Sequence, residues 1–358
     1  MAQIVLVVQA TPNGVSLTWS DGPASFSSYE LPRKGLSTAA DAARTALGLV
    51  VECYFSAEAG DAVVASAKLA QAGYGLYQAL FKPGAEQQAQ ATEIRKWLDK
   101  LQSGGVVETV EVIADGIDPI PWNLVYDRKP DAPASQTSGD DPARWQPFWG
   151  LRYDLAGGRR VSPLRRFPVL QDPRIVVVTD PMVIDNLPTE CRELTALCRE
   201  NRWPLARSRT ELVEIMQAGR PDILYWLGHT QTDPFGLVLG DDVITPDDLK
   251  ALMEGDSFED TAEVFGGVAF LNACGTAGGD TSGSFLDALH PLGLSGYVVT
   301  EQVTVDTFAA PLGREFLSAF AVRGEPLGQV MRRLRGQVPL GLIYGSYCPP
   351  VLRVRRGS

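Results

Sequence analysis

Residues 222–230 read Asp222-Ile-Leu-Tyr-Trp-Leu-Gly-His-Thr230, a continuous apolar run that ends in a reactive side chain. A second run of the same kind, Gly267-Val-Ala-Phe-Leu-Asn-Ala-Cys-Gly275, ends in a cysteine. Continuous apolar runs bounded by glycine are typical of strands that are buried on both faces of a parallel sheet. The two runs therefore predict neighbouring strands of an α/β fold, with one helical crossover between them.

His229 directly follows the first run, and Cys274 lies at the end of the second. Neighbouring parallel strands end at the same edge of a sheet, where ligands and catalytic groups collect in open α/β folds. We therefore expect the imidazole and the thiol to lie close together. A cysteine beside a histidine is an activated nucleophile, because the base takes the proton and the thiolate attacks a carbonyl carbon.

The sequence around the cysteine is Asn272-Ala-Cys-Gly-Thr276, and a glycine-rich turn follows at 278–283. A Gly-Tyr-Val-Val-Thr strand comes next at 296–300, and Asp306 opens an alanine-containing helix. Taken in this order, these motifs resemble the CHAT family of caspase-like cysteine peptidases, which is related to separase.

The resemblance covers about residues 70–358 and departs from the family at Thr230, where family members carry glycine after the histidine. It implies a caspase-like three-layer α/β/α sandwich with a mostly parallel sheet, preceded by a degenerate caspase-like N-terminal half. We therefore expect an N-terminal half at 1–165, with a loop at 128–147, and a catalytic half at 166–358. No tetratricopeptide repeat is visible, so the chain resembles a stand-alone version of the family.

The activity that the resemblance implies is peptide-bond cleavage by a dyad of Cys274 and His229. The thiolate attacks the scissile carbonyl, and the imidazole acts first as base and then as acid toward the leaving amine. The oxyanion is expected to bind the backbone N–H groups of Cys274 and Thr230. No third member of a triad is evident in the sequence.

The resemblance places the substrate pocket at Asp180, Asn272, Glu301 and Asp306. Three of these residues are acids, which favour a basic substrate residue through charge complementarity. Related peptidases that cut after arginine or lysine carry aspartate two residues before the cysteine, where this chain has Asn272. A neutral or apolar residue before the scissile bond is therefore the alternative.

Composition excludes several other classes of protein. The net charge of −11 argues against a nucleic-acid partner, which would require a basic face. No apolar run approaches the roughly 20 residues that span a bilayer, so no membrane association is expected. The five cysteines lack a framework spacing, which indicates a reducing, cytoplasmic compartment. Neither a cofactor nor a metal is expected.

Apolar periodicity and turn signals predict the remaining elements. Strands are expected at 3–9, 15–19, 50–55, 106–113, 174–180, 296–301 and 340–347, and a hairpin is expected at 235–244. Helices are expected at 36–47, 61–81, 85–102, 188–201, 208–217, 245–255, 283–289, 306–321 and 326–335.

The leading functional hypothesis is a cysteine endopeptidase that acts on a protein partner. By resemblance, such proteins often work in bacterial defence or cell-death pathways, and an upstream sensor or activator protein switches them on. Two alternatives stay open. One is a catalytically inactive caspase-like scaffold, and the other is a nucleotide-binding α/β protein that holds phosphate at 276–283. The signal for phosphate binding is weak, because the turn lacks the lysine of a P-loop.

Overall fold

The structure is a computed structural model of the 358-residue chain. It describes residues 2–21, 25–56, 59–103, 107–117, 119–130, 142–159, 169–254, 267–277, 285–289, 294 and 296–357. The chain divides into two compact units, one of Met1–Arg160 with Met331–Gly345 and the other of Val161–Val330 with Ser346–Ser358. Most of the loop expected at 128–147, the whole of the turn at 278–283, and the second histidine, His290, lie outside the described residues.

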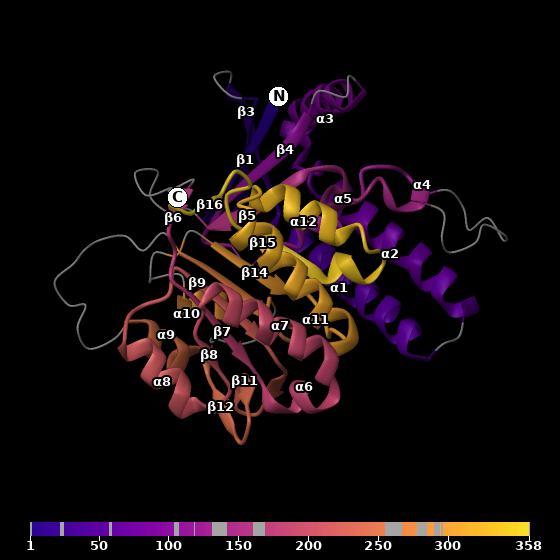
Figure 1. Cartoon of the computed structure of the whole chain (residues 1–358). Coiled ribbons are helices and arrows are strands. Elements are labelled where there is room, and N and C mark those ends of the chain that lie inside the picture. The colour runs from indigo at the N-terminus through magenta and orange to yellow at the C-terminus, as the bar shows by residue number, and fades with distance from the viewer. Residues whose placement is uncertain are drawn as a thin grey trace. The chain divides into compact units, whose positions relative to one another are not determined.

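The second unit is built on a six-stranded sheet in the order β15-β14-β13-β9-β7-β8 (Figure 1). Its strands are β7 Ile175–Thr179, β8 Leu205–Ala206, β9 Ile223–Leu227, β13 Val268–Asn272, β14 Gly296–Thr300 and β15 Tyr344–Tyr347. The strands from β8 to β14 pair in parallel. The two apolar runs of the sequence form β9 and β13, which are direct neighbours as predicted. Both strands therefore end at the same edge of the sheet.

The connecting segments of this unit are helical, as βαβ crossovers require. The helices are α6 Pro181–Asn186, α7 Pro188–Asn201, α8 Arg209–Gln217, α9 Pro246–Glu254, α10 Phe285–Leu289 and α11 Asp306–Phe316, which continues as a π-helix at Leu317–Val322. The next helix is α12 Leu327–Arg335, whose residues from Met331 onward group with the first unit. The start of α9 is a capping box formed by Thr245 and Asp248. Thr245 Oγ1 accepts from the N–H of Asp248 at 3.1 Å, and the Asp248 carboxylate accepts from the N–H of Thr245 at 3.0 Å.

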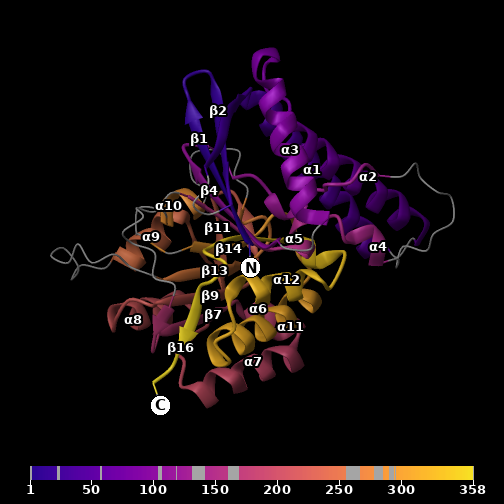
Figure 2. The same ribbon diagram turned by 90° about the horizontal axis from the view of Figure 1, so that it is seen from above.

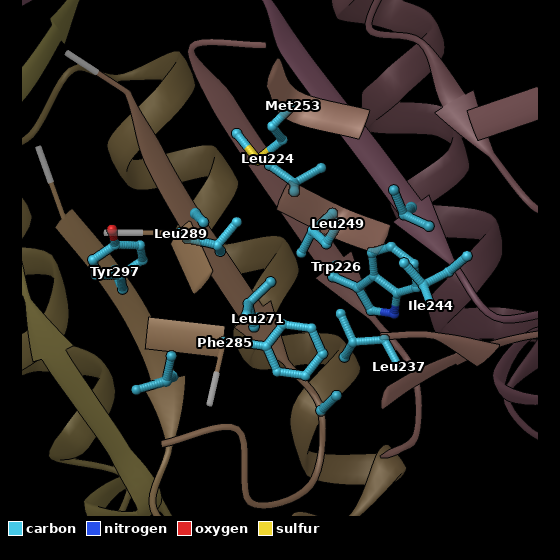
Figure 3. Packing of buried hydrophobic residues seen from close by; sticks show 14 of the residues in the cluster. Leu224, Trp226, Leu237, Ile244, Leu249, Met253, Leu271, Phe285, Leu289 and Tyr297 are labelled. Carbon is cyan, nitrogen blue, oxygen red and sulfur yellow. The ribbon is translucent and has the colours of Figure 1, made fainter. Parts of the chain in front are cut away.

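One face of the sheet packs against α8, α9 and α10. Side chains from the strands meet apolar side chains of these helices in a continuous buried core (Figure 3). Trp226 of β9 lies there among Leu237, Ile244 and Leu249, and all four are buried. Burial of this size drives folding at about 25 cal/mol per Å² of apolar surface.

The other face of the sheet packs against α11. Tyr225 and Phe270 meet edge to face with ring centroids 5.3 Å apart, and Phe270 meets Phe316 of α11 at 4.6 Å. Gly313 lies where α11 crosses the Tyr225 hydroxyl, and any Cβ there would overlap it. Figure 2 shows α7 and α11 on the opposite side of the strands from α8 and α9. These are the three layers of an α/β/α sandwich, so the predicted fold class is confirmed.

Two small sheets complete the second unit. An antiparallel sheet follows β9 and consists of β10 Thr230–Thr232, β11 Phe235–Leu239 and β12 Asp242–Ile244, which confirms the hairpin expected at 235–244. The other is a parallel pair of β6 Val169–Gln171 and β16 Arg353–Arg355.

The first unit holds a mixed sheet in the order β3-β2-β1-β4-β5. The strands are β1 Ala2–Thr11, β2 Gly14–Ser20, β3 Ser25–Leu31, β4 Val107–Asp115 and β5 Asp154–Arg159. The helices are α1 Arg33–Ser56, α2 Ala59–Ala79, α3 Gln88–Ser103, α4 Pro142–Trp145 and α5 Trp149–Arg152, with a short 3₁₀ helix at Trp122–Leu124. Trp19 and Trp149 meet edge to face in its core, with ring centroids 6.3 Å apart.

One expected strand is wrong, and another is confirmed only in its second half. Residues 50–55 belong to the C-terminal part of α1, although the β-branched pair Val50-Val51 by itself favours a strand. The segment expected as a strand at 340–347 begins as a 3₁₀ helix at Leu340–Ile343, and only Tyr344–Tyr347 is extended, at the edge of the sheet. The division at 165/166 stays a prediction, and Met331–Gly345 groups with the first unit.

Candidate active site

His229 lies just beyond the carboxyl end of β9, in a backbone that is held from two sides. Its carbonyl accepts from the N–H of Val238 at 2.9 Å, which attaches it to the hairpin of β11 and β12. The N–H of Gly228 donates to the carbonyl of Asn272 at 3.3 Å, which attaches the same turn to β13. A Cβ at Gly228 would lie 3.1 Å from Asp180 Cβ and from Trp226 Nε1, so a larger residue would require these side chains to shift slightly.

Cys274 lies two residues beyond β13, at the same edge of the sheet, and is only partly buried. Its Sγ lies 3.7 Å from the carbonyl oxygen of Thr304, in the loop that follows β14. The next residue, Gly275, has a φ of 62°, which turns the chain sharply after the cysteine. The other thiols of this unit, Cys191, Cys198 and Cys348, are buried.

The imidazole of His229 lies between a carboxylate and the thiol. Its Nε2 is 3.4 Å from Oδ2 of Asp306, the first residue of α11. Hydrogen bonding to Asp306, followed by that to Cys274, raises the pKa of His229 from 6.5 to about 10, whereas burial lowers it. The imidazole therefore carries its proton at neutral pH.

Thr230 links the histidine and cysteine loops. Its hydroxyl donates to the carbonyl of Cys274 at 2.8 Å. The bond between Val238 and His229 marks a hydrogen-bonded pair of the antiparallel ladder, and such pairs alternate with non-bonded ones. Thr230, which stands opposite Leu237, is thus in a non-bonded pair, and its N–H points away from β11.

Three of the four residues expected to line a substrate pocket are buried. Asp180 is 0 % exposed, and its carboxylate accepts from the N–H groups of Met182 and Gly240, at 3.2 and 3.3 Å. It caps α6 and holds the turn between β11 and β12. A cap followed by proline at N1 is a helix-start signal that the sequence already contained at Asp180-Pro181.

Asn272 is also 0 % exposed and donates to the Tyr225 hydroxyl at 3.0 Å and to the Ala309 carbonyl at 2.9 Å. It fastens α11 to the sheet. Glu301 is 3 % exposed and accepts from the Tyr347 hydroxyl at 2.8 Å. Of the four expected pocket residues, only Asp306 reaches the surface, and it faces His229.

Two large apolar side chains are exposed close to this edge of the sheet. Met182, in the first turn of α6 after β7, is 55 % exposed, and Val303, in the loop after β14, is 50 % exposed. β7 lies next to β9 and β14 lies next to β13, so these residues follow the strands on either side of the pair that carries His229 and Cys274. Neither residue could be predicted from the sequence, since a single exposed apolar residue gives no periodic signal.

The first residue of 276–283, the candidate phosphate-binding turn, has a structural role. Thr276 is buried; its hydroxyl lies 3.0 Å from the carbonyl oxygen of Leu271, and its N–H donates to the Thr300 hydroxyl at 3.2 Å. Within the described ranges, no three His, Cys, Asp or Glu side chains converge in a way that could hold a metal ion. None of the helices described above has both the length and the apolar character to cross a membrane.

The fold is caspase-like and is similar to that of separase. Two crystal structures of the Saccharomyces cerevisiae separase–securin complex match this chain with TM-scores of 0.53 and 0.52, both at 9 % identity. Each match covers 99 % of this chain and 30 % of the matched chain, so this chain spans less than a third of its structural neighbour. The match includes the residues before 70, which the sequence resemblance left out. No family model and no curated protein matches the sequence.

Proposed function

We propose that the chain is a cysteine endopeptidase with Cys274 as nucleophile and His229 as its acid–base partner. The observation that supports this most strongly is the position of the imidazole, which lies at the shared edge of β9 and β13 between the thiol and the Asp306 carboxylate. A cationic imidazole favours the thiolate form of a neighbouring cysteine, and the thiolate is the nucleophile.

The proposed reaction runs through an acyl-enzyme. The sulfur of Cys274 attacks the scissile carbonyl carbon, and the oxyanion that forms accepts hydrogen bonds from the N–H groups of Cys274 and Thr230. The intermediate collapses as the C–N bond breaks, and His229 gives its proton to the leaving amine. His229 then takes a proton from water, which attacks the thioester and releases the carboxylic acid with the free cysteine.

Asp306 acts in this proposal on His229 rather than in a substrate pocket. A carboxylate that accepts from Nε2 fixes the orientation of the ring and leaves the other ring nitrogen for the thiol. The sequence suggested a dyad without a third member. The 3.4 Å distance between His229 and Asp306 supports a third, orienting residue instead.

The substrate is proposed to be a protein partner. The matched structures are of a complex between separase and securin, and a protein bound to a protease of the same fold is in keeping with a macromolecular substrate or regulator. With Asp180, Asn272 and Glu301 buried, and with Met182 and Val303 exposed, an apolar residue beside the scissile bond is favoured over a basic one. A defence or cell-death pathway in the cytoplasm, controlled by an upstream sensor or activator, completes the proposal.

Selective alkylation tests the reactive thiol without knowledge of a substrate. Brief treatment of the folded protein with iodoacetamide, followed by peptide mapping, should label Cys274 well before Cys191, Cys198 and Cys348, which are buried. Cys53, which is half-buried in the first unit, serves as the internal reference for an ordinary accessible thiol. Labelling of Cys274 no faster than Cys53 at pH 6.5 would favour the inactive scaffold.

A further inference from the structure

The peptide group that follows the nucleophile is held from both sides. Thr230 Oγ1 donates to the carbonyl of Cys274 at 2.8 Å, and the next N–H, that of Gly275, donates to the carbonyl of Gln302 at 3.1 Å. The first contact comes from the histidine loop and the second from the loop after β14. Since a peptide group is planar, bonds to its C=O and its N–H together fix the orientation of the whole plane.

This orientation restrains the backbone from which the sulfur of Cys274 extends. The ψ angle of Cys274 is set by the plane that Thr230 and Gln302 hold, and the φ of Gly275, at 62°, gives the sharp turn that the plane requires. A rotation of this plane would move the thiol relative to His229. Errors of about 1 Å in the position of a reacting group can cost on the order of 100-fold in rate.

Thr230 suits this contact for two reasons. It is β-branched, so its χ1 angle is restricted and its hydroxyl is held in few positions. It also directly follows His229, so that a single residue joins the backbone of the candidate base to the backbone of the candidate nucleophile. A glycine at this position could supply the backbone N–H but not the hydroxyl.

We propose that the Thr230 hydroxyl is a positioning group that holds the Cys274–Gly275 peptide so that the thiol stays aligned with His229. This inference rests on the proposed peptidase function and deepens it. We call the hydrogen bond from the Thr230 hydroxyl to the Cys274 carbonyl the tether, because it joins the segment after His229 to the segment that carries the nucleophile. Thr230 does not touch the reacting atoms through its side chain. It acts through the nucleophile's own backbone.

Paired substitutions at Thr230 test the tether. Thr230→Val keeps the shape and removes the hydroxyl, and kcat should fall roughly 10- to 100-fold with KM changed less than about 3-fold. Thr230→Ser restores the hydroxyl and should recover most of the lost kcat. Thr232→Val makes the same change two residues along β10, at an exposed position, and should leave kcat unchanged.

Alkylation gives a second measurement that does not depend on a substrate. In Thr230→Val, the rate of iodoacetamide modification of Cys274 at pH 6.5 should drop several-fold, because the thiolate loses the aligned imidazolium that stabilises it. The rate at pH 9.5 should change less, because an ordinary cysteine is itself largely ionised at that pH. If Thr230→Val does not fold, Thr230→Ala takes its place in both measurements.

Three results would overturn the tether: Thr230→Val with wild-type kcat and alkylation rate, equal losses in Thr230→Val and Thr230→Ser, or a loss confined to thermal stability. A wild-type protein that cleaves no peptide would count against the peptidase function instead. In that case the alkylation rates still decide whether Thr230 aligns the thiol.

Discussion

The Nε2 atom of His229 lies 3.4 Å from Oδ2 of Asp306, and this contact joins the end of β9 to the first residue of α11. A carboxylate in this position holds the ring and stabilises its positive charge. Asp306 would otherwise be taken for a specificity residue, since it follows the strand beside Cys274. The two roles predict different kinetics.

Asp306→Asn should lower kcat/KM by about 10- to 100-fold for every peptide tested, because the change affects the acid–base group rather than the contact with one substrate residue. Cleavage rates of a mixed peptide library measure this directly. Asp185→Asn, at an exposed position of α6, is the matched control. A loss confined to peptides with arginine or lysine before the scissile bond would assign Asp306 to a pocket.

The pH dependence of activity should change in the same variant. In the wild type, the pKa of His229 is raised to about 10 mainly by Asp306, so the general acid is retained until the pH rises toward that value. Without the carboxylate, the imidazolium is less stable, its pKa falls, and the alkaline limb of the pH–rate profile moves to lower pH. Profiles from pH 6 to 10.5 are the measurement. An unmoved limb would show that another group controls it.

The raised pKa of His229 also predicts how the stability of the fold depends on pH. A histidine whose pKa is higher in the folded than in the unfolded chain stabilises the fold fully below the unfolded value, near 6.5. This stabilisation is lost as the pH rises through the folded value, near 10. The difference in Tm between wild type and His229→Gln should therefore be largest at about pH 6 and shrink toward pH 10. A difference that grows with pH would contradict the pairing.

Asn272 should behave as a structural residue. Asn272→Ala removes the bonds to the Tyr225 hydroxyl and the Ala309 carbonyl, and loss of such buried partners costs about 1–3 kcal/mol of unfolding free energy. Urea unfolding measures the loss, with the exposed Asn186→Ala as control. Peptide preference should not change. A stable variant that selects different peptides would return Asn272 to the substrate pocket.

Replacement of Gly313 tests whether the contact with Tyr225 fixes the position of α11 on the sheet. The helix crosses the Tyr225 hydroxyl so closely that the Cβ of an alanine would overlap it. Gly313→Ala should displace α11, lower the Tm by several degrees, and reduce activity, because the same helix begins with Asp306. Gly35→Ala, where a Cβ meets nothing within 4 Å, is the control in α1. Full stability in Gly313→Ala would show that α11 is not fixed by this contact.

The central part of the fold could be predicted because its signal is local and unambiguous. The apolar runs that became β9 and β13 are too continuous for amphipathic elements, and their terminal glycines mark where the strands stop. Parallel pairing then places His229 and Cys274 at one edge. The cap of α9 was predictable for a similar reason, since Thr245 and Asp248 carry their own hydrogen-bonding partners.

The roles of the acids could not be predicted, because they depend on packing across the sheet. Asp180 and Glu301 differ from Asp306 only in which surface their side chains reach, and a single sequence does not record this. The Val50-Val51 pair failed for a different reason, since β-branched residues favour strands locally while the surrounding helix α1 decides the outcome.

The most direct test of the proposed function compares the cleavage of an unbiased peptide library by the wild type and by Cys274→Ala. If the proposed function is correct, the wild type cleaves at defined sites, Cys274→Ala cleaves nothing and has an unchanged Tm, and Cys53→Ala cleaves as the wild type does. Equal cleavage by the wild type and Cys274→Ala, or no turnover by a wild-type protein whose Cys274 reacts no faster than Cys53, would contradict it.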